Sequence, residues 1–178
     1  PLAVGVDNVL GARLATDHLL QLGHRSVIHL AGPEGWNESE ARIQGWRSAM
    51  EARAVEKPHF FRAENWSADS AFRVGQEIAG LDGISAVFCA SDHLALGMLS
   101  ALRDRGLDVP GNVSVVGFDD VAEAAHFTPP LTTVRQDFHE LARRAVAMAG
   151  AAIEGVAGPP DLVVPRLVVR RSTAPRRP

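Results

Sequence analysis

The sequence is poor in cysteine, in charge of one sign and in long apolar runs, and each shortage excludes a class of protein. Cys89 is the one cysteine among 178 residues, so no disulfide can form within the chain, which fits a reducing compartment. Its apolar neighbours predict a buried, inert thiol. The formal net charge is −3, without the basic excess that nucleic-acid binding requires. No apolar run approaches the roughly 18 residues of a membrane-spanning helix.

The short motifs of common catalytic and nucleotide-binding sites are also missing. There is no G-x-S-x-G elbow, Walker A loop, G-x-G-x-x-G or H-E-x-x-H. The seven histidines are scattered, and His24 and His29 flank opposite ends of one predicted strand, where they cannot share a metal ion. Receiver-type phosphoacceptor domains carry their acids near the first strand, whereas Asp119 and Asp120 come late. We therefore predict no enzyme, no metal and no cofactor.

What the sequence does contain is an alternation of short apolar runs with helical patterns. Hydrophobic residues make up 46% of the chain, enough for a substantial core. The alternation is typical of an α/β fold with a doubly wound, mostly parallel sheet. The predicted strands are 2–6, 26–31, 59–62, 84–89, 113–118, 131–134, 162–164 and 166–170. The predicted helices are 12–22, 37–54 with a capping box at its start, one capped by Ser67, 92–105 and 138–155.

Polar residues gather just after several predicted strands. Ligands of such sheets bind outside the carboxyl ends of the strands. Asp119 and Asp120 directly follow the strand 113–118, where carboxylates can meet a polar ligand without being buried in the core. Capping of the following turn is the alternative for both residues, and it weighs more for Asp120.

The helix predicted over 92–105 is apolar around most of its circumference, so a single stripe facing the core cannot account for it. Its apolar residues are Leu94, Ala95, Leu96, Met98, Leu99, Ala101 and Leu102. Either this helix is buried on both sides or it faces a partner, and we favour the partner.

Six stretches of the sequence together resemble the lac-repressor (LacI/GalR) family of bacterial transcription regulators. They are LLQLGHRSVIHLAGP, ARIQGW, VFCASDHLALGMLSAL, VPGNVSVVGFDD, PPLTTVRQDF and LVVRRSTAP, in the order and spacing of the family. In that family a helix-turn-helix and a hinge helix precede a two-lobed core similar to periplasmic sugar-binding proteins. The resemblance implies that 11–131 is the C-terminal lobe and that 1–10 and 132–178 are a remnant of the N-terminal lobe with crossovers and tail. It also implies that the DNA-binding domain is absent from this chain.

By position, the resemblance implies a set of effector contacts: Arg42, Trp66, Ser91, Asp119 and Gln136, with Trp36 as a further one. Each type suits a sugar, because guanidinium and carboxylate groups bind neighbouring hydroxyls and an indole face stacks on an apolar ring side. Core packing is the alternative for Trp66, and a surface position is the alternative for Arg42. Many relatives have asparagine where this chain has Ser91, so the sugar is not specified.

The function implied by the resemblance is effector sensing and dimerisation in a cytoplasmic DNA-binding regulator. Such a protein would be a homodimer without membrane contact, and it would bind operator DNA only through the missing N-terminal domain. The implied dimer interface includes Ala95, Leu96, Leu99 and Phe127. An exported sugar-binding protein of a transport system is the alternative, since it shares the fold and a similar cleft. The closely kept VSVVGFDD and PPLTTVRQDF stretches favour the regulator.

Overall fold

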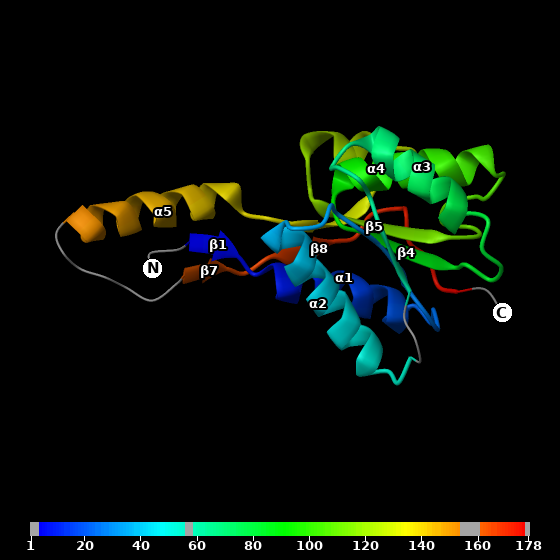
Figure 1. Cartoon of the computed structure of the whole chain (residues 1–178), viewed down its shortest axis with the longest axis horizontal. Coiled ribbons are helices and arrows are strands. Elements are labelled where there is room, and N and C mark those ends of the chain that lie inside the picture. Colours follow the sequence, from blue (N-terminus) through cyan, green and yellow to red (C-terminus); the bar gives the residue numbers. More distant parts are fainter. Residues whose placement is uncertain (1–3, 56–58, 154–160, 177–178) are drawn as a thin grey trace.

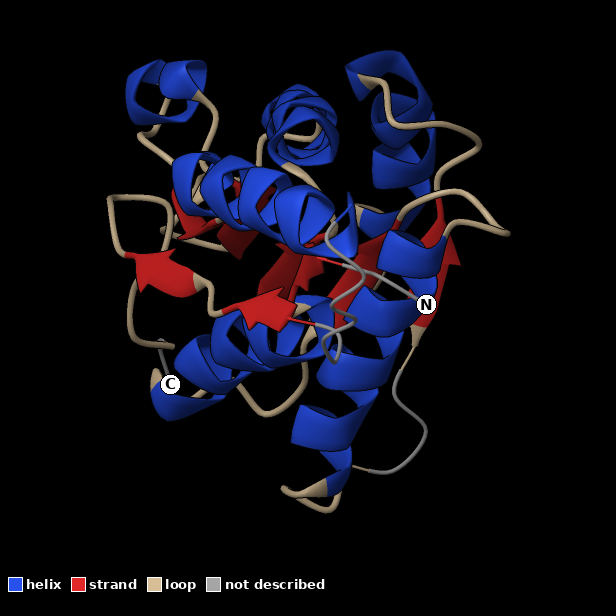
Figure 2. Cartoon of the chain, turned by 90° about the vertical axis from the view of Figure 1, so that its left-hand side faces the viewer, coloured by secondary structure: helices blue, strands red, loops and turns tan. Residues whose placement is uncertain are grey.

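A computed structural model of the chain describes residues 4–55, 59–153 and 161–176. A six-stranded sheet with helices on both faces forms the larger part, and a smaller unit extends from one end of it (Figures 1 and 2). The strands of the six-stranded sheet, in spatial order, are β3 (Phe60–Arg62), β2 (Ile28–Ala31), β4 (Ala86–Cys89), β5 (Ser114–Asp119), β6 (Thr132–Arg135) and β8 (Arg166–Val168). All neighbours are parallel except β6 and β8, so the predicted α/β class with a mostly parallel sheet is confirmed.

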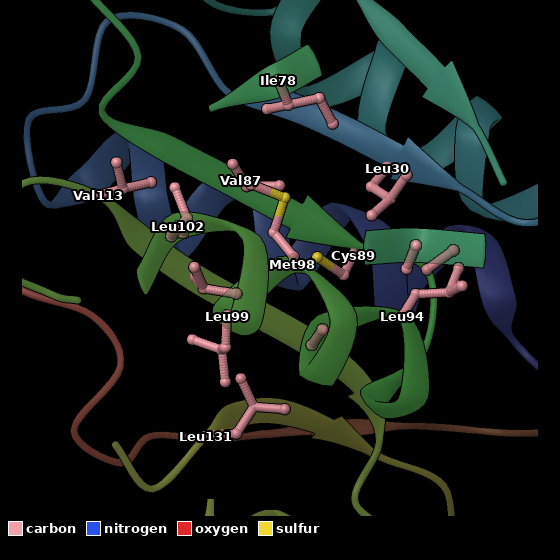
Figure 3. Close-up of a cluster of buried hydrophobic side chains, with 14 of the residues drawn as sticks. Leu30, Ile78, Val87, Cys89, Leu94, Met98, Leu99, Leu102, Val113 and Leu131 are labelled. Carbon is pink, nitrogen blue, oxygen red and sulfur yellow. The ribbon is translucent and has the colours of Figure 1, made fainter. Parts of the chain in front are cut away.

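Each face of the six-stranded sheet is covered by one pair of helices (Figure 1). The pair on one face is α1 (Asn8–Gln21) and α2 (Asn37–Glu51), and the pair on the other is α3 (Ala68–Ile78) and α4 (Asp92–Asp104). Under α1 and α2 the core is built around Trp46, Phe88 and Phe118. Under α3 and α4 it is aliphatic and contains the fully buried Cys89, whose pKa is raised by burial (Figure 3). The burial predicted for the Cys89 thiol is confirmed.

The smaller unit, which we call the extension, consists of β1 (Val4–Val6), α5 (Phe138–Ile153) and β7 (Asp161–Val163). Strands β1 and β7 form a separate two-stranded parallel sheet, and α5 lies beside them (Figure 1). The chain passes between the extension and the six-stranded sheet at Asp7, at 136–137 and at 164–165.

The six-stranded sheet extends beyond the predicted boundary at residue 131. Strand β6 pairs with β5, placing Thr133 opposite Gly117, and β8 pairs antiparallel with β6. The segment after β8 also belongs here, because Ser172 donates a hydrogen bond to the carbonyl of Val115 at 2.6 Å. Residues 132–135 and 166–176 are therefore not part of the other unit. Sheet membership depends on pairing with distant strands, which local sequence patterns do not encode.

Caps were predicted at the N-termini of two helices, α3 and α2. The hydroxyl of Ser67 accepts a hydrogen bond from the Ser70 amide at 3.1 Å, which confirms the cap of α3. The capping box predicted at the start of α2 is wrong. Asn37 is already the first helical residue there, and the N-cap position, Trp36, has no side-chain acceptor. A short 3₁₀ helix, η1 (Ala122–His126), was not predicted.

Candidate functional site

Polar and aromatic side chains line a hollow of about 200 Å³ at the carboxyl edge of the six-stranded sheet. Its lining residues are Trp36, Glu38, Arg42, Trp66, Ser91, His93 and Asp119. Five of the six predicted effector contacts are among them. The sixth, Gln136, donates a hydrogen bond to Asp119 at 2.5 Å and so adjoins the hollow. The structure thus gathers residues from Trp36 to Gln136, which lie a hundred positions apart in the sequence.

Arg42 is held rigidly at the base of the hollow. It lies on the buried face of α2 and is only 4% exposed, so the surface alternative for this residue is wrong. Its guanidinium donates to the carbonyl of Ala90, donates to the Asn8 side chain at 2.9 Å and stacks over Phe118 at 3.8 Å. Burial lowers the pKa of Arg42, and the nearby carboxylate of Asp119 opposes this. These contacts hold the guanidinium, a charged donor, in one orientation.

Asp119 ends β5 in an unusual backbone conformation. Its φ is 112° and that of Asp120 is 58°, a region that side chains other than glycine rarely adopt. Such strain costs about 1–3 kcal/mol per residue and is typical of functional positions. The carboxylate of Asp119 lies 3.6 Å from the Arg42 guanidinium, and burial raises its pKa while Arg42 opposes that shift. The strained turn presents this acceptor to the hollow.

Two indole rings form the apolar side of the hollow. Trp66 is half-buried and meets Trp36 edge to face, with ring centroids 6.0 Å apart and planes at 82°. The position of Trp66 depends on Gly32, because a Cβ at that glycine would lie 2.2 Å from the indole. Trp66 also packs against the core under α3 and α4, so the core-packing alternative holds for part of its surface. Its remaining surface lines the hollow, and Trp36 is 53% exposed beside it.

Ser91 has a structural role in addition to lining the hollow. It is the N-cap of α4, and its hydroxyl accepts a hydrogen bond from the Leu94 amide at 3.1 Å. The hydroxyl proton remains able to reach a ligand, since one hydroxyl both donates and accepts. Ser91 therefore offers one donor to the hollow.

The second aspartate of the acidic pair does not face the hollow. The Asp120 side chain is 3% exposed and forms ion pairs with Arg135 and Arg170. It joins the end of β5 to β6 and to the segment after β8. Neither turn capping nor ligand contact describes Asp120, whose partners come from distant strands.

A third carboxylate, that of Asp92, is buried behind the hollow. It accepts hydrogen bonds from the Thr133 hydroxyl at 2.6 Å and from the Val121 amide at 2.9 Å. Burial raises the pKa of Asp92 to about 7. A Cβ on Gly117 would lie 2.3 Å from this carboxylate, so the glycine in β5 is what lets it approach. Asp92 ties the start of α4 to β6 and to the turn that carries Asp119.

Three residues in or beside the hollow were not predicted. Glu38 and His93 line the hollow from the first turns of α2 and α4, and Asn8 accepts the hydrogen bond from Arg42. A usable signal existed for Glu38 and His93, because first-turn positions after a strand face the carboxyl edge of the sheet. Asn8 lies at a passage between the two units and gave no local signal.

The helix predicted to face a partner is mostly buried within the chain. Ala95 is 0% exposed and Leu99 is 7% exposed, so burial on both sides accounts for most of the apolar circumference of α4. Ala95 therefore has no surface for a partner to cover and Leu99 has little, while the interface itself stays a prediction. The helix packs against β4, β5 and α3, and Ala124 and Leu131 belong to the same core. Leu96, at 38%, and the half-buried Phe127 keep surface that a partner could cover.

The chemistry of the hollow is that of a binding site. It offers a fixed guanidinium, carboxylate acceptors, a hydroxyl and two indole rings. In the described part of the chain, no group of three or more His, Cys, Asp or Glu side chains could hold a metal ion. None of the described helices has the length and apolarity to cross a bilayer.

Comparison with known proteins gives a consistent result. A family model described as "Periplasmic binding protein-like domain" matches residues 16–173. The lactose operon repressor of Escherichia coli (strain K12) is 34% identical over 165 residues, which is 92% of this chain and 45% of that protein. The chain thus spans about half the length of this curated relative.

Solved structures extend the comparison to the fold. A LacI family regulator from Enterococcus faecium with bound ribose matches with a TM-score of 0.89 and 27% identity, over 99% of this chain and 67% of that one. A dimeric lac repressor matches with a TM-score of 0.91 and 31% identity, over 97% of this chain and 64% of that one.

Proposed function

Because this chain belongs to the periplasmic-binding-protein-like family and corresponds to the effector-binding region of LacI-type regulators, we propose that it senses a small polyol and helps a transcription regulator dimerise. The observation that carries the proposal is the convergence of Arg42, Asp119 and Trp66 on one hollow. The relatives are named as repressors and regulators, which supports this function over solute transport and over catalysis.

The charges of the hollow favour a neutral ligand. Asp119 and Glu38 are acidic, and the one arginine in the lining, Arg42, already neutralises Asp119. A phosphorylated or carboxylated sugar would therefore enter a half-site whose single guanidinium is already paired with a carboxylate. Hydroxyl groups, in contrast, can donate to the carboxylates and accept from Arg42 and Ser91. We propose an uncharged sugar with its apolar face against Trp66.

The hydrogen bonds around the hollow suggest how a ligand could act at a distance. Arg42 binds Asn8 and Asp119 binds Gln136, and both partners lie where the chain passes between the six-stranded sheet and the extension. A ligand that shifts Arg42 or Asp119 would therefore act directly on two of the passages. Ligand binding would favour one angle between the two units over another. In the whole regulator this change would alter operator affinity.

The partners of the whole protein follow from the same proposal. A second copy of the chain would contact Leu96 and Phe127, in line with the dimeric lac repressor to which the fold is similar. Operator DNA would be bound by a domain outside this chain, and the protein would act in the cytoplasm.

Calorimetry on the full-length protein tests the placement of the effector site. Neutral pentoses, hexoses and disaccharides are titrated into wild type, Asp119→Ala and Trp66→Ala. Asp119→Ala removes a charged hydrogen-bonding partner of the ligand, and it should cost roughly 2–4 kcal/mol of binding free energy, or about thirtyfold or more in affinity. Glu34→Ala, an exposed residue outside the hollow, is the control and should bind like wild type. Unchanged affinity in both hollow variants would show that the site lies elsewhere.

Sedimentation tests the proposed dimer contact separately. Leu96→Glu places a charge on the exposed edge of α4 and should shift the full-length protein toward monomers. Leu81→Glu is the matched control, because Leu81 is 41% exposed but precedes β4 on a different part of the surface. Dissociation by the control alone would refute the interface.

A further inference from the structure

A second cavity, of about 470 Å³, lies at the edge of the six-stranded sheet opposite to the hollow. It is bordered by Ile28 and Ala86, the first residues of β2 and β4, whereas the hollow lies beyond the last residues of these strands. The cavity has more than twice the volume of the hollow and falls within the usual range for small-molecule sites. It belongs neither to the effector site nor to the α4 edge.

The floor of this cavity is apolar. Ile28, Phe61 and Ile84 line it, and each is partly buried against the core under α3 and α4. Leu81, at 41% exposure, stands in the same lining as a large apolar side chain in contact with water. A ligand with an apolar body would remove this surface from water, which is favourable in proportion to the area covered.

The rim of the cavity is basic. Arg25, Arg176 and His59 are exposed there, and Asp82 is the one acidic residue in the lining. Neither arginine forms an ion pair with any residue that the structure describes. Guanidinium groups bind carboxylates, sulfonates and phosphates through paired hydrogen bonds. The two guanidinium groups at the rim can therefore bind an anion, whereas the arginine of the hollow is paired with Asp119.

The walls of the cavity are held in place by hydrogen bonds behind them. The hydroxyl of Ser85 lies 3.1 Å from Nδ1 of the buried His24, whose Nε2 lies 3.2 Å from the Ala174 carbonyl. The Arg176 amide donates to the Leu22 carbonyl at 2.8 Å. The segment that carries Arg176 is thus fixed against the loop before β4, so little ordering is needed when a ligand binds.

We propose that this cavity binds a small amphipathic anion, meaning an aromatic or aliphatic body with one carboxylate, sulfonate or phosphate group. The apolar body lies on Ile28, Phe61 and Ile84, and the anionic group is bound by Arg25 and Arg176 at the rim. The chain would then carry two sites of opposite preference, one for a neutral polyol and one for an apolar anion.

A fluorescence titration of the full-length protein with 8-anilinonaphthalene-1-sulfonate tests the proposal, because this probe combines apolar rings with a sulfonate. We expect saturable binding that the double variant Arg25→Glu/Arg176→Glu weakens about tenfold or more. N-phenyl-1-naphthylamine, which has the same rings without the sulfonate, should bind more weakly and should not respond to the charge reversal. Both substituted arginines are exposed, so folding should be preserved, and a thermal melt checks this.

Two further variants separate the cavity from other surfaces. Ile84→Trp fills the floor of the cavity and should abolish binding of the sulfonate probe. Asp119→Asn alters the hollow and should leave the affinity for the sulfonate probe unchanged. The proposal is overturned if the arginine reversal changes sulfonate affinity less than about twofold, a difference of about 0.4 kcal/mol. Retention of binding in Ile84→Trp, or equal affinity for the two probes, would overturn it as well.

Discussion

Helices α4 and α5 are both rich in apolar residues and similar in length, yet the segments that cover them differ. Eight of the 13 residues of α4 are buried, whereas none of the 16 residues of α5 is. Helix α4 lies between the six-stranded sheet, α3 and the segment around η1. Helix α5 lies beside the short strands β1 and β7 (Figure 1). An amphipathic pattern therefore indicates a helix, but the amount of buried surface depends on what covers the apolar face.

The apolar surface of the extension follows from the same difference. Phe138, Val146 and Ile153 on α5 are 56%, 74% and 88% exposed, and Leu162 on β7 is 50% exposed. Several large apolar side chains exposed on one helix and a neighbouring strand suit a contact site. We expect the rest of the second lobe to cover it in the full-length protein. The next four predictions test the difference between the six-stranded sheet and the extension, from the largest effect to the smallest.

Core truncation should show the largest difference. Phe88 is fully buried in β4, stacked on His29 with ring centroids 4.6 Å apart, so Phe88→Ala should lower the free energy of unfolding by about 3–5 kcal/mol. Ile153→Ala, which removes an apolar side chain from α5, should cost less than about 0.5 kcal/mol. Urea denaturation of the two variants gives both numbers. A large cost for Ile153→Ala would show that α5 is covered in this chain.

Ion pairs should differ in the same direction. Asp120→Asn leaves Arg135 and Arg170 without their buried partner, and it should cost about 2–3 kcal/mol, less than a fully enclosed pair because Arg135 is 40% exposed. Glu140 on α5 binds Arg143 and Arg144, and these two arginines lower its pKa to about 2. Water screens this exposed cluster, so Glu140→Gln should leave the urea midpoint unchanged. Equal losses in both variants would contradict the assignment of Asp120 as a structural tie.

Acid should destabilise the six-stranded sheet through His29. Burial lowers the pKa of His29 from 6.5 to about 3. Between these two pH values the unfolded chain is protonated at His29 and the folded chain is not. The contribution of His29 to the free energy of unfolding is therefore complete above pH 6.5. It is lost as the pH falls toward 3, by about 1.4 kcal/mol per pH unit. Asp92 acts oppositely: its pKa is raised to about 7, so protonation at low pH favours the folded chain.

A pair of histidine variants isolates this effect. His29→Phe keeps the ring between Trp46 and Phe88 and should reduce the loss of stability between pH 6.5 and 4.5. His139→Phe, at an exposed position of α5, is the control and should follow wild type. If acid unfolding of His29→Phe matched that of wild type, His29 would not be the group responsible.

The smallest effect is expected on the exposed face of α5. Val146→Lys should change the free energy of unfolding by less than about 0.5 kcal/mol, since the side chain is already in water. Wild type is the reference, and urea denaturation followed by far-ultraviolet circular dichroism measures the difference. Loss of structure in Val146→Lys would mean that the extension contributes more than its burial indicates.

Local patterns in the chain were enough to place most helices and strands, because the periods of 3.6 and 2 are properties of a single segment. They also placed Asp119 at the edge where ligands bind, since a buried strand must end before a carboxylate can reach water. The resemblance to a known family added the partners of Asp119, and all six predicted contacts lie in or beside the hollow.

What the patterns missed depends on contacts between distant segments. Asp120 was left between turn capping and ligand contact until the structure placed Arg135 and Arg170 around it. Likewise, the apolar circumference of α4 led us to predict a partner, whereas in the structure Ala124 and Leu131 pack in the same core as this helix. The pairing of β6 and β8 within the six-stranded sheet likewise depends on contacts between distant segments. A residue's type and spacing set which contacts it can make, and the packing of remote strands selects which of them it does make.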